Sequence, residues 1–303
     1  MKTIKGIIPP MITPLKGDDQ IDREGTVRLT EHILAGGVHA LFLLGTTGEA
    51  QSLTYELRYE FVELVCRQVA GRVPVLVGVT DTSLDESVRM AAHAAKCGAV
   101  GVVAAAPYYF APSQQELVEY YTALADALPL PLYLYNMPSH VKVFLEPATV
   151  KRLAEHPNIV GLKDSSANMN YFQTLIYHLG DRDDFSLYVG PEELTGESVL
   201  LGADGGVNGG ANIFPELYVA MYDAAAAHDV ARVRELQRRI MQISTTIYTV
   251  GKYGSSYLKG VKCALSLLGI CDDYLSYPYR RFRAEERARI REALEALGVA
   301  CKE

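Results

Sequence analysis

A lysine at the end of an apolar run is the residue best placed for covalent chemistry. The segment 159–162 (Ile-Val-Gly-Leu) has the composition of a buried β-strand, and Lys163 follows it directly. Gly161 lies on the same strand face as Lys163 and leaves space beside the amine. An apolar environment favours the neutral amine, which can attack a carbonyl carbon and form a Schiff base. The alternative is a strand-end lysine whose ammonium group reaches solvent.

Two other segments that follow apolar runs offer complementary groups. Tyr135 ends the run 132–134, where a phenol can move protons to and from a reacting oxygen; the alternative is a hydrogen-bonded core tyrosine. The turn Gly45-Thr46-Thr47-Gly48 follows the run 41–44 and presents backbone N–H groups and two hydroxyls, which suit a small carboxylate. A turn without a ligand is the alternative. An amine, a phenol and an anion-binding turn together predict a Schiff-base site for a 2-keto acid.

These segments belong to a pattern that repeats along the chain: a short apolar run, a loop and an amphipathic helix. Eight strand candidates begin near Ile7, Ala40, Val73, Val100, Pro131, Ile159, Phe185 and Gly205. Eight such units predict an α/β fold of the (β/α)8 TIM-barrel type, in which catalytic residues lie at the C-terminal ends of the strands. A doubly wound open sheet is the competing topology, although no G-x-G-x-x-G motif follows the first strand.

The remaining length predicts additional C-terminal helices. We expect residues 1–228 to form the barrel and residues 229–303 to form a helical extension packed on it, within a single structural domain. The extension is expected to contain helices over about 229–249, 254–269 and 281–298, from the spacing of apolar residues.

Composition narrows the class of protein. The 303 residues carry a formal net charge of −7, which argues against nucleic acid or an anionic membrane as a partner. The five cysteines are far apart and the histidines lack H-x-x-x-H spacing, so neither a disulfide framework nor a metal site is expected. The N-terminal segment has no apolar signal core, and no apolar run approaches the roughly 20 residues that span a bilayer. We therefore expect a cytoplasmic protein.

Three motifs carry a resemblance to a known family. They are Gly45-Thr46-Thr47-Gly48-Glu49, Tyr135-Asn136-Met137-Pro138 and Gly161-Leu162-Lys163-Asp164-Ser165. The chain resembles the dihydrodipicolinate synthase and N-acetylneuraminate lyase family of class I pyruvate aldolases in the residues, the order and the spacing of these three motifs. The resemblance extends from about residue 6 to residue 282.

The resemblance implies roles for individual residues. Lys163 would form the Schiff base, Tyr135 would shuttle protons, and Thr46 would relay protons to Tyr135. Tyr109 matches a relay tyrosine that, in the synthases, reaches in from a neighbouring subunit. Thr47 would bind the keto-acid carboxylate. The family likeness also implies a homotetramer built as a dimer of dimers, with no metal and no cofactor beyond the covalent imine.

The substrate is less constrained than the chemistry. The synthases usually have an arginine where His140 stands, and the sialic acid lyases usually have a serine where Gly209 stands. These departures favour cleavage or formation of a 2-keto-3-deoxy sugar acid or a similar hydroxy-keto acid. Glu192 and Glu193 would accept hydrogen bonds from the hydroxyls of such a substrate. The expected substrate-binding residues are Thr47, Gly45, Val207, Gly190, Glu192, Glu193, Ser165 and His140.

Several other activities remain open at this point. The same imine would serve a 4-hydroxy-tetrahydrodipicolinate synthase, an N-acetylneuraminate lyase, or a dehydratase or deaminase acting on a 2-keto acid. A keto-acid sensor without turnover is the alternative outside enzymes.

Overall fold

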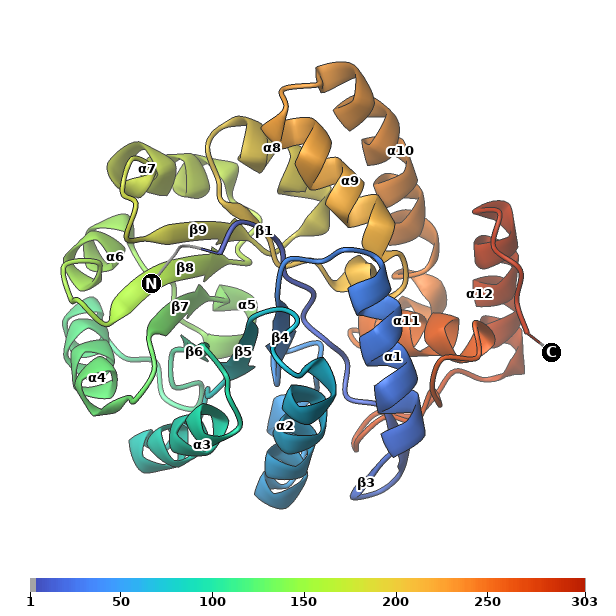
Figure 1. Cartoon of the computed structure of the whole chain (residues 1–303), viewed down its shortest axis with the longest axis horizontal. Coiled ribbons are helices and arrows are strands. Elements are labelled where there is room, and N and C mark those ends of the chain that lie inside the picture. Colours follow the sequence, from blue (N-terminus) through green and yellow to red (C-terminus); the bar gives the residue numbers. More distant parts are fainter. Residues whose placement is uncertain (1–3, 303) are drawn as a thin grey trace.

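A closed ring of parallel strands forms the centre of the computed structural model, which describes residues 4–302 (Figure 1). The strands are β1 (Gly6–Ile7), β4 (Leu41–Leu43), β5 (Val75–Gly78), β6 (Gly101–Ala105), β7 (Leu132–Asn136), β8 (Ile159–Asp164), β9 (Ser186–Val189) and β10 (Gly205–Gly206). They pair in the order β1-β10-β9-β8-β7-β6-β5-β4. The ring closes beyond β1, where the Phe42 N–H donates to the Pro9 carbonyl at 3.0 Å and the Met11 N–H donates to the Phe42 carbonyl at 2.9 Å. The predicted TIM barrel is confirmed, and the open sheet is wrong.

Helices surround this ring. Those up to the end of the barrel are α1 (Arg23–Ala35), α2 (Tyr55–Val69), α3 (Leu84–Lys96), α4 (Gln114–Ala127), α5 (Pro138–Val141), α6 (Pro147–Leu153), α7 (Met169–Leu179), α8 (Thr195–Leu200) and α9 (Pro215–Ala226). Side-chain caps define where several of them begin: Ser113 and Glu116 form a reciprocal capping box at α4, and Thr54 accepts from the Leu57 N–H at α2.

The register of the central strands brings two of the predicted site residues together. Tyr135 on β7 stands opposite Lys163 on β8, because the two strands run parallel and in register at this level. Gly161 is needed lower on β8, since a Cβ atom there would lie 2.6 Å from the Tyr133 ring and 2.8 Å from the Ser186 carbonyl oxygen. Gly161 therefore lets β7 and β9 pack directly against β8 below the site.

A short antiparallel hairpin was not predicted. It consists of β2 (Leu15–Gly17) and β3 (Gln20–Ile21), joined by a turn in which Asp19 has a φ of 49°. Asn and Asp tolerate this left-handed conformation better than most residues, and the run Gly17-Asp18-Asp19 between Leu15 and Ile21 was the available signal.

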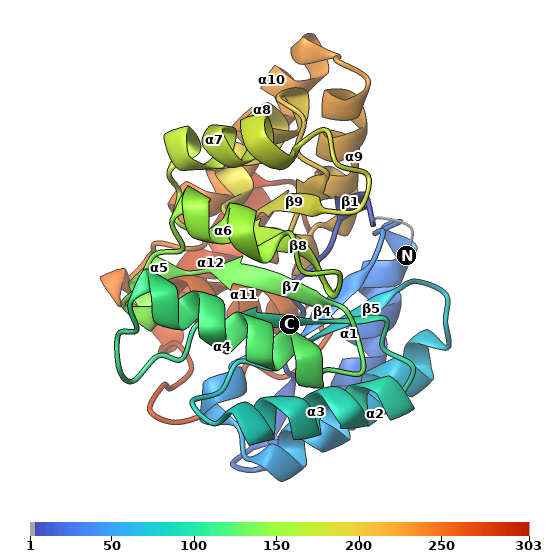
Figure 2. The same cartoon turned by 90° about the vertical axis from the view of Figure 1, so that its left-hand side faces the viewer.

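The last helices lie together on one side of the barrel (Figures 1 and 2). They are α10 (Val230–Thr246), α11 (Ser256–Leu267) and α12 (Ala284–Ala296), close to the expected ranges. The Arg28 Nε atom on α1 donates to the Ile270 carbonyl at 2.7 Å, which ties the segment after α11 to the barrel. Within residues 4–302, no helix combines the length and apolar character that crossing a bilayer requires.

Candidate active site

A cavity of about 620 Å³ opens at the C-terminal ends of the strands. It contains eleven of the twelve predicted site residues: Lys163, Tyr135, Thr46, Thr47, Gly45, Val207, Gly190, Glu192, Glu193, Ser165 and His140. Tyr109 is the exception. Its side chain is 69% exposed on the loop between β6 and α4, outside the cavity of its own chain.

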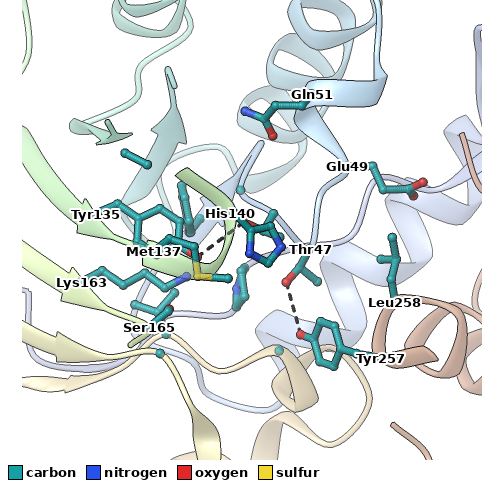
Figure 3. Close-up of a pocket in the computed structure, with 18 of the residues that line it drawn as sticks. Thr47, Glu49, Gln51, Tyr135, Met137, His140, Lys163, Ser165, Tyr257 and Leu258 are labelled. Atoms are coloured by element: carbon teal, nitrogen blue, oxygen red, sulfur yellow. Dashed lines mark hydrogen bonds between the residues drawn. The ribbon is translucent and has the colours of Figure 1, made fainter. Parts of the chain in front are cut away.

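Lys163 and Tyr135 face each other inside this cavity (Figure 3). The Lys163 side chain is only 6% exposed, and its Nζ atom lies 4.2 Å from the centroid of the Tyr135 ring and 5.3 Å from that of Phe42. Both residues are fixed by strands β7 and β8 rather than by flexible loops. An amine with an open cavity in front of it and a phenol beside it can form a covalent adduct and exchange protons with it.

The Tyr135 phenol is placed to accept a proton. Burial by itself would raise its pKa, but the positive charge of Lys163 opposes this, as do hydrogen bonds with Thr46, Ser165 and Lys163. The balance lowers the pKa of Tyr135 below its ordinary value. The Thr46 hydroxyl lies 3.5 Å from the phenol oxygen, which connects Tyr135 to the turn after β4.

That turn is held in shape by hydrogen bonds to its backbone. The Gly48 N–H donates to the Gly45 carbonyl at 3.0 Å, and the Thr13 hydroxyl donates to the Gly48 carbonyl at 2.7 Å. The second hydroxyl of the turn, that of Thr47, lies 3.2 Å from the Tyr257 hydroxyl of α11. The turn therefore presents one hydroxyl to Tyr135 and the other to the C-terminal helices.

A network beneath the cavity holds the ends of β7, β8 and β9. Asn136 donates to the Asp164 carboxylate at 2.8 Å, and Ser166 donates to the same carboxylate from its backbone N–H and its hydroxyl. Gly190 packs so closely that a Cβ atom there would lie 2.1 Å from the Ser165 Oγ atom. Gly190 is thus needed to leave Ser165 facing the cavity beside Lys163.

Glu192 lines the cavity, but its carboxylate is already engaged. The hydroxyls of Tyr218 and Tyr248 both donate to its Oε1 atom, and the Gly210 N–H donates to Oε2 at 2.8 Å. Burial raises its pKa to about 7, although these three donors favour the charged form. These hydrogen bonds of Glu192 to other residues of the protein were not predicted. Its contact with substrate hydroxyls remains a prediction.

His140 lies on the short helix α5 at the mouth of the cavity. Its Nδ1 atom is 3.0 Å from the Ser139 hydroxyl, and desolvation lowers its pKa below the ordinary value. The imidazole is therefore neutral near pH 7 and supplies a hydrogen bond rather than a positive charge.

Sequence reasoning missed the tyrosines that the C-terminal half brings to the site. They are Tyr218 on α9, Tyr248 after α10 and Tyr257 on α11. The glycine pair after Val207 was the available signal, because glycines permit close approach of other groups. A Cβ atom at Gly209 would lie 1.5 Å from the Tyr257 hydroxyl oxygen, and one at Gly210 would lie 1.9 Å from that of Tyr218.

Comparison with known proteins assigns the family. The model of the dihydrodipicolinate synthetase family matches residues 3–297. The chain belongs to this family. It is 33% identical to the 4-hydroxy-tetrahydrodipicolinate synthase of Methanopyrus kandleri over 298 residues, which are 98% of this chain and 97% of the relative. It is also 33% identical to the probable 2-dehydro-3-deoxy-D-pentonate aldolase YjhH of Escherichia coli K12 over 302 residues, 99% of each chain.

A solved structure agrees with the family assignment. The chain shares 59% sequence identity and a TM-score of 0.95 with the dihydrodipicolinate synthase structure from Bacteroides thetaiotaomicron, covering 98% of this chain and 99% of that one. The predicted family membership is confirmed, and so is the predicted class of enzyme, a carbon–carbon lyase. In the described range 4–302, no group of three or more His, Cys, Asp or Glu side chains is arranged to hold a metal ion.

Proposed function

We propose that the protein is a Schiff-base aldolase that cleaves a 2-keto-3-deoxy sugar acid to pyruvate and an aldehyde, or forms it by the reverse reaction. The observation that carries this proposal is the buried pair of Lys163 and Tyr135. The Lys163 Nζ atom lies 4.2 Å from the centroid of the phenol ring, and the Thr46 hydroxyl lies 3.5 Å from the phenol oxygen. An amine and a proton acceptor in this arrangement are the two groups that a retro-aldol reaction through an imine requires.

The proposed reaction uses Lys163 as the nucleophile. Its neutral amine adds to the C2 carbonyl of the keto acid, and with the uptake of one proton water leaves, which gives a protonated imine. Tyr135, as the phenolate, takes the proton of the C4 hydroxyl, the C3–C4 bond breaks, and the electron pair of that bond moves into the protonated imine to form the neutral pyruvate enamine. The aldehyde leaves. Tyr135 returns the proton to C3, and water hydrolyses the imine to release pyruvate and the free amine.

The remaining cavity residues suit the two ends of such a substrate. The Thr47 hydroxyl and the backbone of the turn would bind the carboxylate, while Ser165, Gly190 and the Val207 carbonyl would border the pyruvate unit. His140 and Glu193 line the part of the wall available to the sugar hydroxyls, together with any oxygen of Glu192 that remains free to accept.

Charge argues for an uncharged aldehyde. Among the described residues that line the cavity, the basic side chains are Lys163 and His140, and arginine is absent. Lys163 becomes part of the imine and His140 is neutral near pH 7, so nothing there offers the two-pronged grip of a guanidinium on a second carboxylate. A hydroxylated aldehyde needs no such partner.

A second candidate is the condensation of pyruvate with aspartate semialdehyde by a 4-hydroxy-tetrahydrodipicolinate synthase. The names of the Methanopyrus kandleri relative and of the Bacteroides thetaiotaomicron structure favour it. It would use the same imine and the same tyrosine, and it differs only in the group that must be recognised at the mouth of the cavity.

Product assays separate the two candidates. Release of pyruvate from a panel of 2-keto-3-deoxy sugar acids can be followed with lactate dehydrogenase, and consumption of aspartate semialdehyde with pyruvate can be followed in parallel. Faster turnover of a sugar acid supports the first candidate, and turnover of aspartate semialdehyde alone supports the second. Loss of water or ammonia without pyruvate release would instead identify a dehydratase or deaminase.

We further propose that the protein works as a homotetramer in which Tyr109 enters the site of a neighbouring subunit. Tyr109 and Phe110 are 69% and 80% exposed, and their rings stack edge to face with centroids 5.1 Å apart. Two exposed aromatic side chains at one loop tip suit an interface between subunits. Light scattering of the full chain tests the subunit count, and a monomer with full activity would contradict the role of Tyr109.

A further inference from the structure

Helix α11 contacts two residues of the segment 45–49, which carries Thr46 and Thr47. Its Tyr257 hydroxyl lies 3.2 Å from the Thr47 hydroxyl, and its Lys262 ammonium group forms an ion pair with Glu49 (Figure 3 shows Tyr257, Thr47 and Glu49). Residues 257 and 262 are separated by about 7.5 Å along a helix axis. One helix of the C-terminal part therefore holds the segment after β4 at two points, Thr47 and Glu49.

The Lys262 contact is buried and additionally hydrogen-bonded. Lys262 is 0% exposed and Glu49 is 5% exposed. The Lys262 Nζ atom also donates to the Tyr274 carbonyl at 2.7 Å, and the second Glu49 oxygen accepts from the Ser276 N–H at 2.9 Å. Buried charges with such partners are costly to separate, so this end of the turn is firmly anchored to α11 and the segment after it.

The Tyr257 side chain, whose hydroxyl contacts that of Thr47, is closely packed against its neighbours. A Cβ atom at Gly209 would lie 1.5 Å from the Tyr257 hydroxyl oxygen, so the absence of a side chain there gives the phenol its place. The Tyr257 ring also packs edge to face on Tyr248, with centroids 4.8 Å apart. Close packing at Gly209 and at Tyr248 therefore accompanies the contact of the phenol with Thr47.

We propose that α11 completes the keto-acid site, with Tyr257 as a positioning residue that orients the Thr47 hydroxyl toward the substrate carboxylate and Lys262 as the anchor at Glu49, two residues further along the chain. This inference rests on the proposed function, in which Thr47 binds that carboxylate. Tyr257 acts through Thr47 and takes no part in proton transfer at C3 or C4. The helical extension is then a working part of the site rather than an appendage of the barrel.

The Tyr257→Phe variant tests this inference, because it removes the hydroxyl and keeps the ring. Borohydride trapping of the imine across a range of pyruvate concentrations gives the half-saturating concentration of pyruvate for the whole 303-residue chain. We expect Tyr257→Phe to raise that concentration about two- to tenfold, the range for loss of one neutral hydrogen bond. The adduct formed at saturating pyruvate and the kcat for the true substrate should change little, because Lys163 and Tyr135 are untouched.

Tyr253→Phe is the matched control. The Tyr253 hydroxyl donates to Glu286 at 2.8 Å from the same part of the chain, and the residue does not line the cavity. It should bind pyruvate like the unsubstituted protein. An equal shift in both variants, or no shift in Tyr257→Phe, would overturn the inference. No adduct in the unsubstituted protein would overturn the proposed function itself, and the inference with it.

Gly209→Ala supplies an independent check. Its new methyl group must displace the Tyr257 hydroxyl, so it should also weaken pyruvate binding. If both changes act through the contact with Thr47, the shift in the Gly209→Ala/Tyr257→Phe double variant should be smaller than the product of the two single shifts. A double variant whose shift equals that product would contradict a shared route through Tyr257.

Discussion

Replacing Glu192 with glutamine should remove a pH dependence of stability that the fold imposes on this carboxyl group. Burial raises the pKa of Glu192 from 4.5 to about 7, with Glu193 adding to the rise and Tyr218, Tyr248 and the Gly210 N–H opposing it. Because the folded-state pKa is raised, the protonated form is the one that folding favours. The stabilisation is fully present below about pH 4.5 and is lost as the pH rises through about 7.

The size of this effect follows from the two pKa values. A carboxyl group with a pKa of 4.5 unfolded and about 7 folded loses about 2.5 kcal/mol of stabilisation between pH 5 and pH 8. Glutamine does not titrate, so Glu192→Gln should lack this loss. The free energy of unfolding of the unsubstituted protein, minus that of the variant, should therefore fall by about 2.5 kcal/mol over the same interval.

Urea denaturation of both proteins at the two pH values measures this difference. Any constant offset, such as poorer acceptance of the Gly210 N–H by an amide, cancels because only the change with pH is compared. Each value should be taken at fixed protein concentration, since assembly into the proposed tetramer would also contribute to stability. If the free energy of unfolding changed equally with pH in the two proteins, the claim that folding favours the protonated form of Glu192 would be refuted.

Three further substitutions test the site. Tyr135→Phe should lower kcat, measured in steady-state assays, about a hundredfold or more, while borohydride trapping should show that the pyruvate imine still forms on Lys163. Unchanged turnover would mean that Tyr135 takes no part in proton transfer. His140→Arg should raise kcat/KM for an aldehyde that bears a carboxylate relative to an aldehyde that bears hydroxyls, measured with the two aldehydes in competition. No change in the ratio of the two kcat/KM values would exclude position 140 from substrate recognition. Gly190→Ala should displace Ser165, whose Oγ atom would lie 2.1 Å from the new methyl group, and should weaken pyruvate binding; normal binding would contradict the tight packing at this point.

The parts of the site that sequence could predict are those carried by strand ends. Lys163 and Tyr135 end apolar runs, and parallel strands in a barrel bring such ends to one rim, so local pattern was enough to place them together. The same reasoning found the turn that carries Thr46 and Thr47. These predictions needed only the alternation of strands and helices, which the apolar spacing reveals.

The contacts that sequence could not predict join distant segments of the chain. Thr47 and Tyr257 are 210 positions apart, and nothing in the periodicity of α11 distinguishes a tyrosine that reaches the cavity from one that packs in the core. Glu192 was predicted to face substrate on the basis of its position after β9. Its two tyrosine partners come from α9 and from the segment after α10, which local pattern does not place. The β2–β3 hairpin was missed because strands of two or three residues are too short to show alternation.

Covalent capture of pyruvate on Lys163 tests the proposed chemistry most directly. The protein would be incubated with pyruvate, reduced with borohydride and digested, and the peptide bearing Lys163 would be examined by mass spectrometry beside the Lys163→Met variant. We predict a reduced pyruvate adduct on Lys163 in the unsubstituted protein and none in the variant. A folded protein without an adduct, or an adduct on another lysine, would contradict the imine mechanism.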